Sequence, residues 1–484
     1  MSQPQAPRSS IIYQNVSRSV ILIDIPTSIG LAQRLPHRIK TGETPLDEDV
    51  PALLSSDPLQ DPYPNPPEPS STVARNRLLR QIPDTQLELA RLVEPLIDNA
   101  LQELKEKHGG EWCFPRYSGL SSGTGTKRRM RMHEGFRHRA SKRHQESSDD
   151  EPIFSSKNEL LDGHVSGNEP PLVLAPGVNQ FPNLSTIRNT AVQNAACTST
   201  ILNIKLDSEG EPSNPRTGPL PTPNYISIDI PAKSTFLLTH LRAPTSSDPN
   251  PILSLSSGKK FDLIVMDPPW PNRSVRRSSH YREETDSLQP LLEGILKSNI
   301  NPRHSIVAMW TTNSSKSRSM ASNAMKAAGL HLFEEWIWVK TTAKGQPVSP
   351  VAGLWRKPYE ILILAHNEKH TCPEDGTGKG NGSCKIRRRV IFAVPDIHSR
   401  KPNLREVIED LFFSSPTGQS EENDAAEGDR EHERQIRPYV ALEVFARNLT
   451  AGWWSCGDEV LRFNWKGWWD ESGKEKGEEK GTGC

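Results

Sequence analysis

The run FDLIVM at residues 261–266 leads straight into Asp267, Pro268, Pro269 and Trp270. A short, mainly apolar run that stops abruptly at prolines predicts a buried strand of a parallel sheet. The carboxyl ends of such strands form the edge at which α/β enzymes build their sites. The chain is therefore expected to fold as an α/β protein with this tetrad at the edge of its sheet.

The tetrad carries groups that suit a planar amine. Asp267 accepts one N–H bond, and the carbonyl groups of Asp267 and Pro268 are free to accept a second, because proline has no N–H and a fixed φ. Trp270 offers a flat ring on which a nucleobase can stack. The alternative is that Pro-Pro only ends a strand while Trp270 packs in the core. We predict Asp267, Pro268, Pro269 and Trp270 as the catalytic residues.

Strands and helices are expected to alternate in this half of the chain. Segments rich in Val, Ile, Phe and Trp predict strands at 225–230, 261–266, 305–312, 334–341, 359–366, 389–394 and 439–446. Helical patterns occupy 286–298, 315–329 and 402–413. Together they predict a Rossmann-like sheet flanked by helices. No G-x-G-x-x-G follows any of these strands, which argues against a nicotinamide enzyme.

The tetrad and several later segments resemble one known family in content and order. The stretch FDLIVMDPPWPNRSVRRSSHY is similar to the DPPW branch of the S-adenosylmethionine-dependent N6-adenine methyltransferases, the family of the catalytic subunit of the messenger-RNA adenine methyltransferase. Supporting segments are 306–312, 334–341, 357–364, 398–402 and 443–448, followed by Gly457, Asp458 and Glu459. The resemblance spans roughly residues 225–465 and is strongest to the branch called methyltransferase-like protein four. It implies a methyltransferase domain that acts on N6 of adenine.

The resemblance also implies S-adenosyl-L-methionine as the methyl donor, no metal, and a set of donor-binding residues. Lys401 is expected to meet the methionine carboxylate, since the start of the predicted helix also favours an anion; the alternative is a solvated lysine. The residues implied for the ribose are Arg447, Asn448, Asp458 and Glu459. The sequence departs from the family pattern at Asp458, where asparagine is frequent, and at Arg400, where histidine is usual. An aspartate still accepts hydrogen bonds from both ribose hydroxyls.

The substrate is expected to be a nucleic acid, and RNA and DNA present the same adenine amine. The family branch implies a small structured RNA, such as a small nuclear RNA with 2′-O-methyladenosine, and DNA is the alternative. Residues just after the tetrad are candidate substrate contacts, with the arginines facing phosphates; a solvated loop is the other interpretation. These residues are Asn272, Arg273, Ser274, Arg276 and Arg277. A catalytically inactive RNA-binding or scaffold member of the family is an alternative of another class.

Composition predicts one catalytic domain with long additions. The 484 residues include 42 prolines, only 6% are aromatic, and the mean hydropathy is −0.62, so much of the chain is expected to lie outside a core. The expected segments are an N-terminal strand segment (1–39), a Pro-rich linker (40–82), a helical segment (83–114, periodic over 84–107), a mostly disordered region (115–220), the methyltransferase domain (221–469) with insertions at 370–385 and 414–437, and a disordered tail (470–484).

The run KRRMRMHEGFRHRASKRH at 127–144 is the strongest local charge feature in a chain of net charge zero. Such a run is typical of a nuclear import signal, a nucleic-acid clamp or a solvated tract. The chain is expected to be nuclear, with cytoplasmic and mitochondrial placement as alternatives, and active as a monomer. Six cysteines without paired spacing indicate a reducing compartment. The sequence contains no run of about twenty apolar residues, so no membrane span is predicted.

Overall fold

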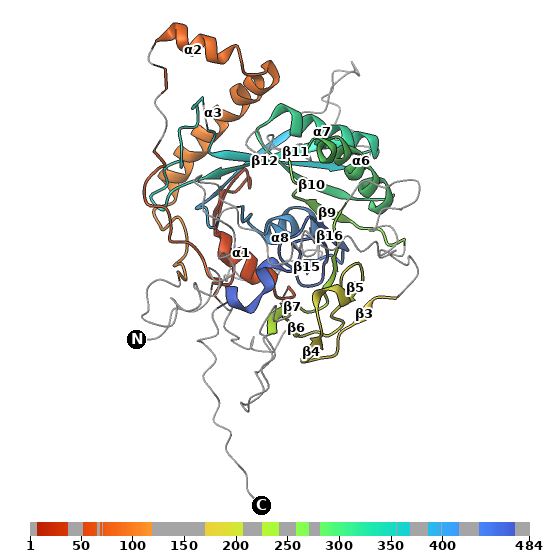
Figure 1. Ribbon diagram of the computed structural model, residues 1–484. Helices are drawn as coiled ribbons and strands as arrows, with labels where there is room; N and C mark the ends of the chain where they lie inside the picture. Colours follow the sequence, from red (N-terminus) through yellow and green to blue (C-terminus); the bar gives the residue numbers. More distant parts are fainter. Residues whose placement is uncertain are drawn as a thin grey trace, which may run out of the picture.

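The computed structural model describes residues 7–36, 52–64, 68–69, 71–118, 170–206, 225–241, 258–270, 281–354, 356–367, 386–397, 399–415 and 435–469. A large sheet runs through the body, and helices cover both of its faces (Figure 1). The predicted α/β class, with a Rossmann-like sheet flanked by helices, is confirmed. No helix in the described part of the chain has the length and apolar character needed to cross a bilayer.

Twelve of the described strands form this sheet. In spatial order they are β1 (Ile11–Gln14), β2 (Val20–Ile23), β13 (Arg387–Ala393), β11 (His331–Lys340), β12 (Tyr359–His366), β10 (Ile306–Thr311), β9 (Leu263–Met266), β16 (Ala441–Val444), β17 (Trp454–Gly457), β8 (Thr235–Leu238), β5 (Ala191–Gln193) and β3 (Leu172–Val173). A second sheet contains β4 (Val178–Phe181), β6 (Thr200–Lys205) and β7 (Tyr225–Ile230). A short hairpin joins β14 (Ser414–Ser415) to β15 (Gln435–Ile436).

The strand directions decide where a site can form. Strands β10, β9, β16, β17 and β8 are parallel neighbours. Strand β12 is antiparallel to both β10 and β11, and β11 is parallel to β13. The carboxyl ends of all these strands except β12 therefore lie at one edge of the sheet, together with the amino end of β12. Chain segments that are distant in sequence meet at this edge.

Helices pack on both faces because the strands are apolar on both sides. One buried cluster joins α3 (Asp84–Lys107), α6 (Tyr281–Asn299) and α7 (Ser315–Ala327) to one face. The other cluster joins α1 (Ile25–Ala32) and α8 (Arg405–Ile408), which continues as a π-helix over Glu409–Phe413, to the opposite face. Figure 1 shows α2 (Thr72–Leu79) and α3 at one end of the molecule; no residue of α2 is buried.

The predicted strands and helices of the catalytic half agree with the observed ones to within a few residues. The largest difference is at α6, which begins at Tyr281 where residue 286 was expected. The helix expected from residue 402 begins at Arg405, and the strand expected from residue 334 begins at His331. The predicted helix at 84–107 is α3, with Pro95 inside it. The expected N-terminal strand is also present, since β2 pairs in parallel with β13 through Ile21 and Ile391.

The structure describes regular elements within two N-terminal segments for which none was expected. Residues 115–220 were expected to be mostly disordered, but 170–206 contain β3 to β6, and Leu202 and Ile204 are buried with Ile228 and Phe236. Their apolar residues are sparse along the sequence and become a core only by pairing with β7 and β8. The linker expected at 40–82 contains α2, and Leu53 forms a β-bridge with Trp469.

Candidate active site

The Asp-Pro-Pro-Trp turn lies at the carboxyl end of β9, as the strand pattern predicted. The backbone N–H of Trp270 donates to the carbonyl oxygen of Pro268 at 2.8 Å, which closes the turn. The Trp270 indole N–H donates to the carbonyl oxygen of Trp310 at 2.7 Å, and the ring is buried in the core. The carboxylate of Asp267 stays partly open, with its side chain 26% exposed. Asp267 is thus available to a ligand, whereas Trp270 is largely occupied in packing.

A half-buried lysine lies beside this carboxylate. Lys401 forms an ion pair with Glu360 at the start of β12, and its Nζ lies 3.8 Å from Oδ1 of Asp267. The same ammonium lies over the rings of Trp310 and Trp338, 5.1 and 5.5 Å from their centroids. The loop after β13 therefore brings Lys401 to the end of β9, although 134 positions separate the two residues in sequence.

A second lysine completes the charged cluster. Nζ of Lys340, the last residue of β11, lies 2.6 Å from Oε1 of Glu360. Burial favours the neutral form of Glu360, but Lys401 and Lys340 outweigh burial and lower its pKa to about 2. Burial raises the pKa of Asp267, and Lys401 and Arg447 oppose that rise. Burial would lower the pKa of Lys401, but Asp267 and Glu360 raise it. Lys401 is therefore held as a cation between two acids.

The low pKa of Glu360 predicts an acid-dependent stability. An acid whose pKa falls from 4.5 to about 2 on folding stabilises the folded state above pH 4.5, and this contribution is lost as the pH falls through about 2. Glu360→Gln should lower the urea midpoint at pH 7. The urea midpoint of the variant should also fall less steeply than that of wild type between pH 4.5 and 2. Glu106→Gln, on the exposed side of α3, controls for the loss of a glutamate. Parallel pH profiles for wild type and Glu360→Gln would contradict this.

The residues predicted to contact a ribose follow β16 and β17 at the same edge. Arg447 lies 2.8 Å from Oε2 of Glu459 and donates to the carbonyl oxygen of Ser399 at 2.9 Å. Asn448 is buried. Asp458 faces His240 at 3.7 Å, and although burial works against its charged form, the contact with His240 lowers the pKa of Asp458. The structure brings these four residues to the edge that carries Asp267.

One pocket joins most of these groups. Its lining includes Asp267, Trp310, Lys401, Glu443, Arg447 and Asn448. Asp458 and Glu459 do not line this pocket. Glu459 nevertheless pairs with Arg447, which does line it. The pocket therefore combines a lysine, an open carboxylate and an arginine at the carboxyl edge of the sheet.

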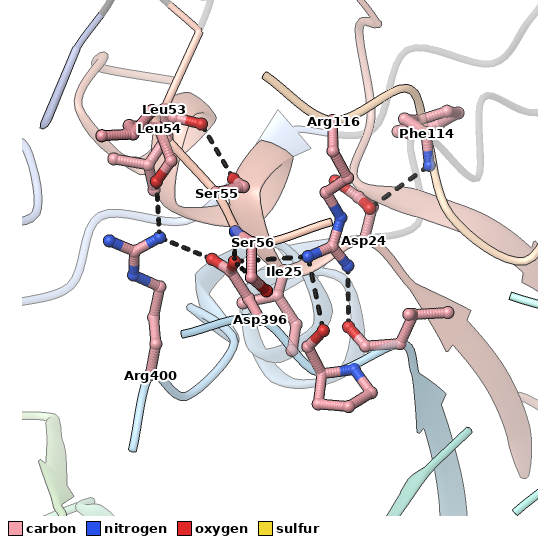
Figure 2. A network of polar contacts seen from close by, with 12 residues as sticks. Asp24, Ile25, Leu53, Leu54, Ser55, Ser56, Phe114, Arg116, Asp396 and Arg400 are labelled. Atoms are coloured by element: carbon pink, nitrogen blue, oxygen red, sulfur yellow. Dashed lines mark hydrogen bonds and ion pairs between the residues drawn. The ribbon is translucent and has the colours of Figure 1, made fainter. Parts of the chain in front are cut away.

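Arg400, next to Lys401, points into a buried polar network and pairs with Asp396. Figure 2 shows Asp396 between Arg400 and Arg116. Arg400 also donates to the carbonyl oxygen of Leu54 at 3.0 Å, and the amide of Ser56 donates to Asp396 at 2.8 Å. The network ties two N-terminal segments to the loop that carries Lys401. In this structure the arginine at the family's usual histidine position joins chain segments together.

The candidate substrate contacts Asn272, Arg273, Ser274, Arg276 and Arg277 lie outside the described residues, as do the basic run at 127–144 and the insertion at 370–385. The described part of the insertion at 414–437 includes β14 and β15. Within the described chain, no three His, Cys, Asp or Glu side chains gather as a possible metal site.

Three site residues were not predicted: Lys340, Glu360 and Glu443. Each interrupts or ends an apolar run within its strand, in WIWVK, YEILIL and ALEV respectively. A charged residue in a buried strand requires a partner or a function. That pattern was the available signal for all three residues.

Fold and site together define a class of protein: a Rossmann-like α/β domain with an Asp-Pro-Pro-Trp turn and a half-buried lysine at the carboxyl edge of its sheet. The particular family follows from comparison. Residues 261–459 match the MT-A70 family model, and this part of the chain is an MT-A70 domain. The family resemblance seen in the sequence is thereby confirmed.

Named relatives agree with this family. The chain is 27% identical over 470 residues to "N6-methyladenosine RNA methyltransferase MTA1" of Cryphonectria parasitica, covering 96% of this chain and 95% of the relative. It is 33% identical over 237 residues to human "N(6)-adenine-specific methyltransferase METTL4", covering 48% of this chain and 43% of the relative. It is 27% identical over 182 residues to "DNA N6-methyl methyltransferase" of Caenorhabditis elegans, covering 37% and 44%. The chain thus spans less than half of the last two relatives.

Proposed function

We propose that this chain is an S-adenosylmethionine-dependent N6-adenine methyltransferase that acts on a structured RNA. The observation that carries the proposal is the open carboxylate of Asp267 beside the cation of Lys401, in one pocket of an MT-A70 domain. A carboxylate at that place accepts an N–H bond of an exocyclic amine.

The residues in the pocket fit the proposed donor. Lys401 can meet a carboxylate, because an ammonium has three N–H donors and Glu360 occupies only part of them. Arg447, Asn448 and the nearby Asp458 and Glu459 supply donors and acceptors for a ribose. Oε2 of Glu443 is buried without a hydrogen-bond partner in the described chain. The donor would supply a methyl group already activated on a sulfonium, so no covalent enzyme intermediate is needed.

The chain's own contribution is then positioning. Asp267 accepts one N–H of the adenine amine and so fixes its direction of attack. The carbonyl oxygen of Pro268 already accepts the Trp270 amide, and its second lone pair is available for the other N–H. Trp270 holds the turn through its bond to Trp310 and has little ring surface left for stacking. The amine gives up its proton after the transfer.

The name of the Cryphonectria parasitica relative specifies RNA, and that of the Caenorhabditis elegans relative specifies DNA. We propose that the substrate is a small structured RNA carrying 2′-O-methyladenosine. The basic run at 127–144 supports a nuclear location. Activity as a monomer is supported by a pocket that one chain forms by itself. These features extend the expectations drawn from the sequence.

The test is methyl transfer from tritiated S-adenosylmethionine to hairpin RNAs with and without 2′-O-methyladenosine, and to DNA of the same sequence, followed by nucleoside mass spectrometry. We expect N6-methylation of RNA, highest with the 2′-O-methylated hairpin. Methylation of DNA alone would overturn the RNA assignment. Absence of both transfer and donor binding by calorimetry would favour the non-catalytic scaffold.

A further inference from the structure

Glu443 is a half-buried acid whose Oε2 is buried without a hydrogen-bond partner in the described structure. It lies on β16 between the core residues Leu442 and Val444, and its side chain lines the pocket on the opposite face of the sheet. Its Oε2 is closed to solvent and makes no hydrogen bond. Across β17 its register partner is Ser455, whose Oγ is likewise buried and unbonded. Two neighbouring polar side chains thus lack the partners that buried polar groups require.

The surroundings of Glu443 contain other charges, but these are used elsewhere. Asp267 directly follows the adjacent strand β9 and faces Lys401. Lys401 is itself paired with Glu360, and Arg447 is paired with Glu459. On β17, Cys456 is a buried thiol whose pKa is raised, first by burial and then by Glu443. Burial, and then the charge of Asp267, raise the pKa of Glu443 to about 8, so near neutrality the side chain is a neutral acid.

An isolated buried acid either stays protonated or is matched by a cation that arrives with a ligand. The proposed donor carries a carboxylate and an ammonium on the same carbon atom. The pocket holds Lys401 for the first of these groups and, in Glu443, an acid without a counter-ion for the second. Asp267 is the less suitable acid for this ammonium, because Lys401 already faces it and the adenine amine requires it.

Resting on the proposed function, we propose that Glu443 binds the α-ammonium group of the methionine end of the donor. The neutral carboxyl group releases its proton to solvent as the ammonium enters, and a carboxylate–ammonium pair replaces it. No other bond forms or breaks. Ser455, the register neighbour, has a hydroxyl that can donate to the carboxylate once it is charged.

Calorimetric titration of the full chain at pH 7 in phosphate and in Tris tests this, because the difference in measured heat counts released protons. With S-adenosylmethionine and S-adenosylhomocysteine, which both have the ammonium, we expect release of on the order of 0.9 proton per site. With 5′-methylthioadenosine, which lacks the amino-acid end, we expect none. Glu443→Gln should abolish the release and weaken S-adenosylhomocysteine binding by about 10- to 100-fold, with 5′-methylthioadenosine binding unchanged. Glu106→Gln, which removes an exposed glutamate of α3 outside the pocket lining, should keep the release.

The outcomes separate the two proposals. Wild-type binding of S-adenosylhomocysteine without proton exchange, or undiminished release by Glu443→Gln, would overturn the role of Glu443 and leave the methyltransferase proposal intact. Absence of donor binding by wild type, while methylation also fails, would overturn both.

A second readout needs no ligand. Because the pKa of Glu443 rises from 4.5 to about 8 on folding, the unfolded chain binds fewer protons between these values, and stability falls as the pH rises through this window. Glu443→Gln removes that loss. The variant should therefore have a higher thermal midpoint than wild type at pH 8 and a similar one at pH 4. An equal or lower midpoint at pH 8 would show that the acid is not unpaired in the folded chain and would overturn the proposal.

Discussion

Asp267→Asn is expected to lower methyl transfer by about 10²- to 10⁴-fold, the range for removal of a positioned acid or base. Asparagine has nearly the same shape, but it replaces one of the two acceptor oxygens by an N–H donor and removes the charge that strengthens the bond to the adenine amine. The same charge lies 3.8 Å from Lys401. Turnover with RNA at saturating donor is the measurement, and circular dichroism spectra of the two proteins should coincide.

The matched control is Asp262→Asn, at the other end of the same stretch. Asp262 accepts hydrogen bonds from the Val440 amide at 2.9 Å and from Asn301 at 2.7 Å, far along the strand from the pocket. It should lower stability by about 1–3 kcal/mol and leave turnover per folded molecule near wild type. Activity of Asp267→Asn within a few-fold of wild type would remove Asp267 from the proposed mechanism.

Asp396→Asn is expected to reduce the free energy of unfolding by about 3–5 kcal/mol, the range for removing one member of a buried ion pair. Asp396 is fully buried and faces two arginines, Arg116 and Arg400, that are themselves 2% and 1% exposed (Figure 2). Asparagine can still accept the Ser56 amide, so the loss would report the charge. The urea midpoint is the measurement. Donor affinity should fall as well, because the network holds the segment that carries Lys401.

Asp61→Asn provides the comparison for this charge removal. Asp61 pairs with Lys344 at 2.9 Å, but its side chain is 76% exposed, so the loss should be about 0–1 kcal/mol. If Asp396→Asn and Asp61→Asn shifted the urea midpoint equally, the buried network would have no special part in joining the N-terminal segments to the catalytic domain.

The predictability of the fold followed the density of apolar residues along the chain. Strand β12, YEILILAH, and strand β13 are dense runs that indicate strands without reference to any neighbour. Strand β2, VILI, is of the same kind, although only the structure shows that it pairs with β13. Strand β6 has alternating burial and stands among polar residues, so no strand was expected there. Its burial depends on β7 and β4, which local periodicity does not reveal.

Site residues likewise differ in how far their place could be predicted from the sequence. Asp267 was found because its strand, its prolines and its position at a strand end are adjacent in sequence. Trp270 illustrates the opposite, since its ring was expected to face a base and instead donates to the carbonyl of Trp310 in the core. Whether an aromatic side chain faces a pocket or the interior depends on the neighbouring strand β10 and not on the tetrad.

The sequence by itself determined the α/β class, the strand that ends in Asp267, and the family resemblance, because all three are encoded by residues close together or in a set order. The tertiary structure alone decided which charges meet. Lys340, Glu360 and Lys401 come from three separate segments and converge because parallel strands and one reversed strand bring their ends to one edge. It also left Glu443 without a partner, since burial and pairing are properties of surroundings that form only when the chain folds.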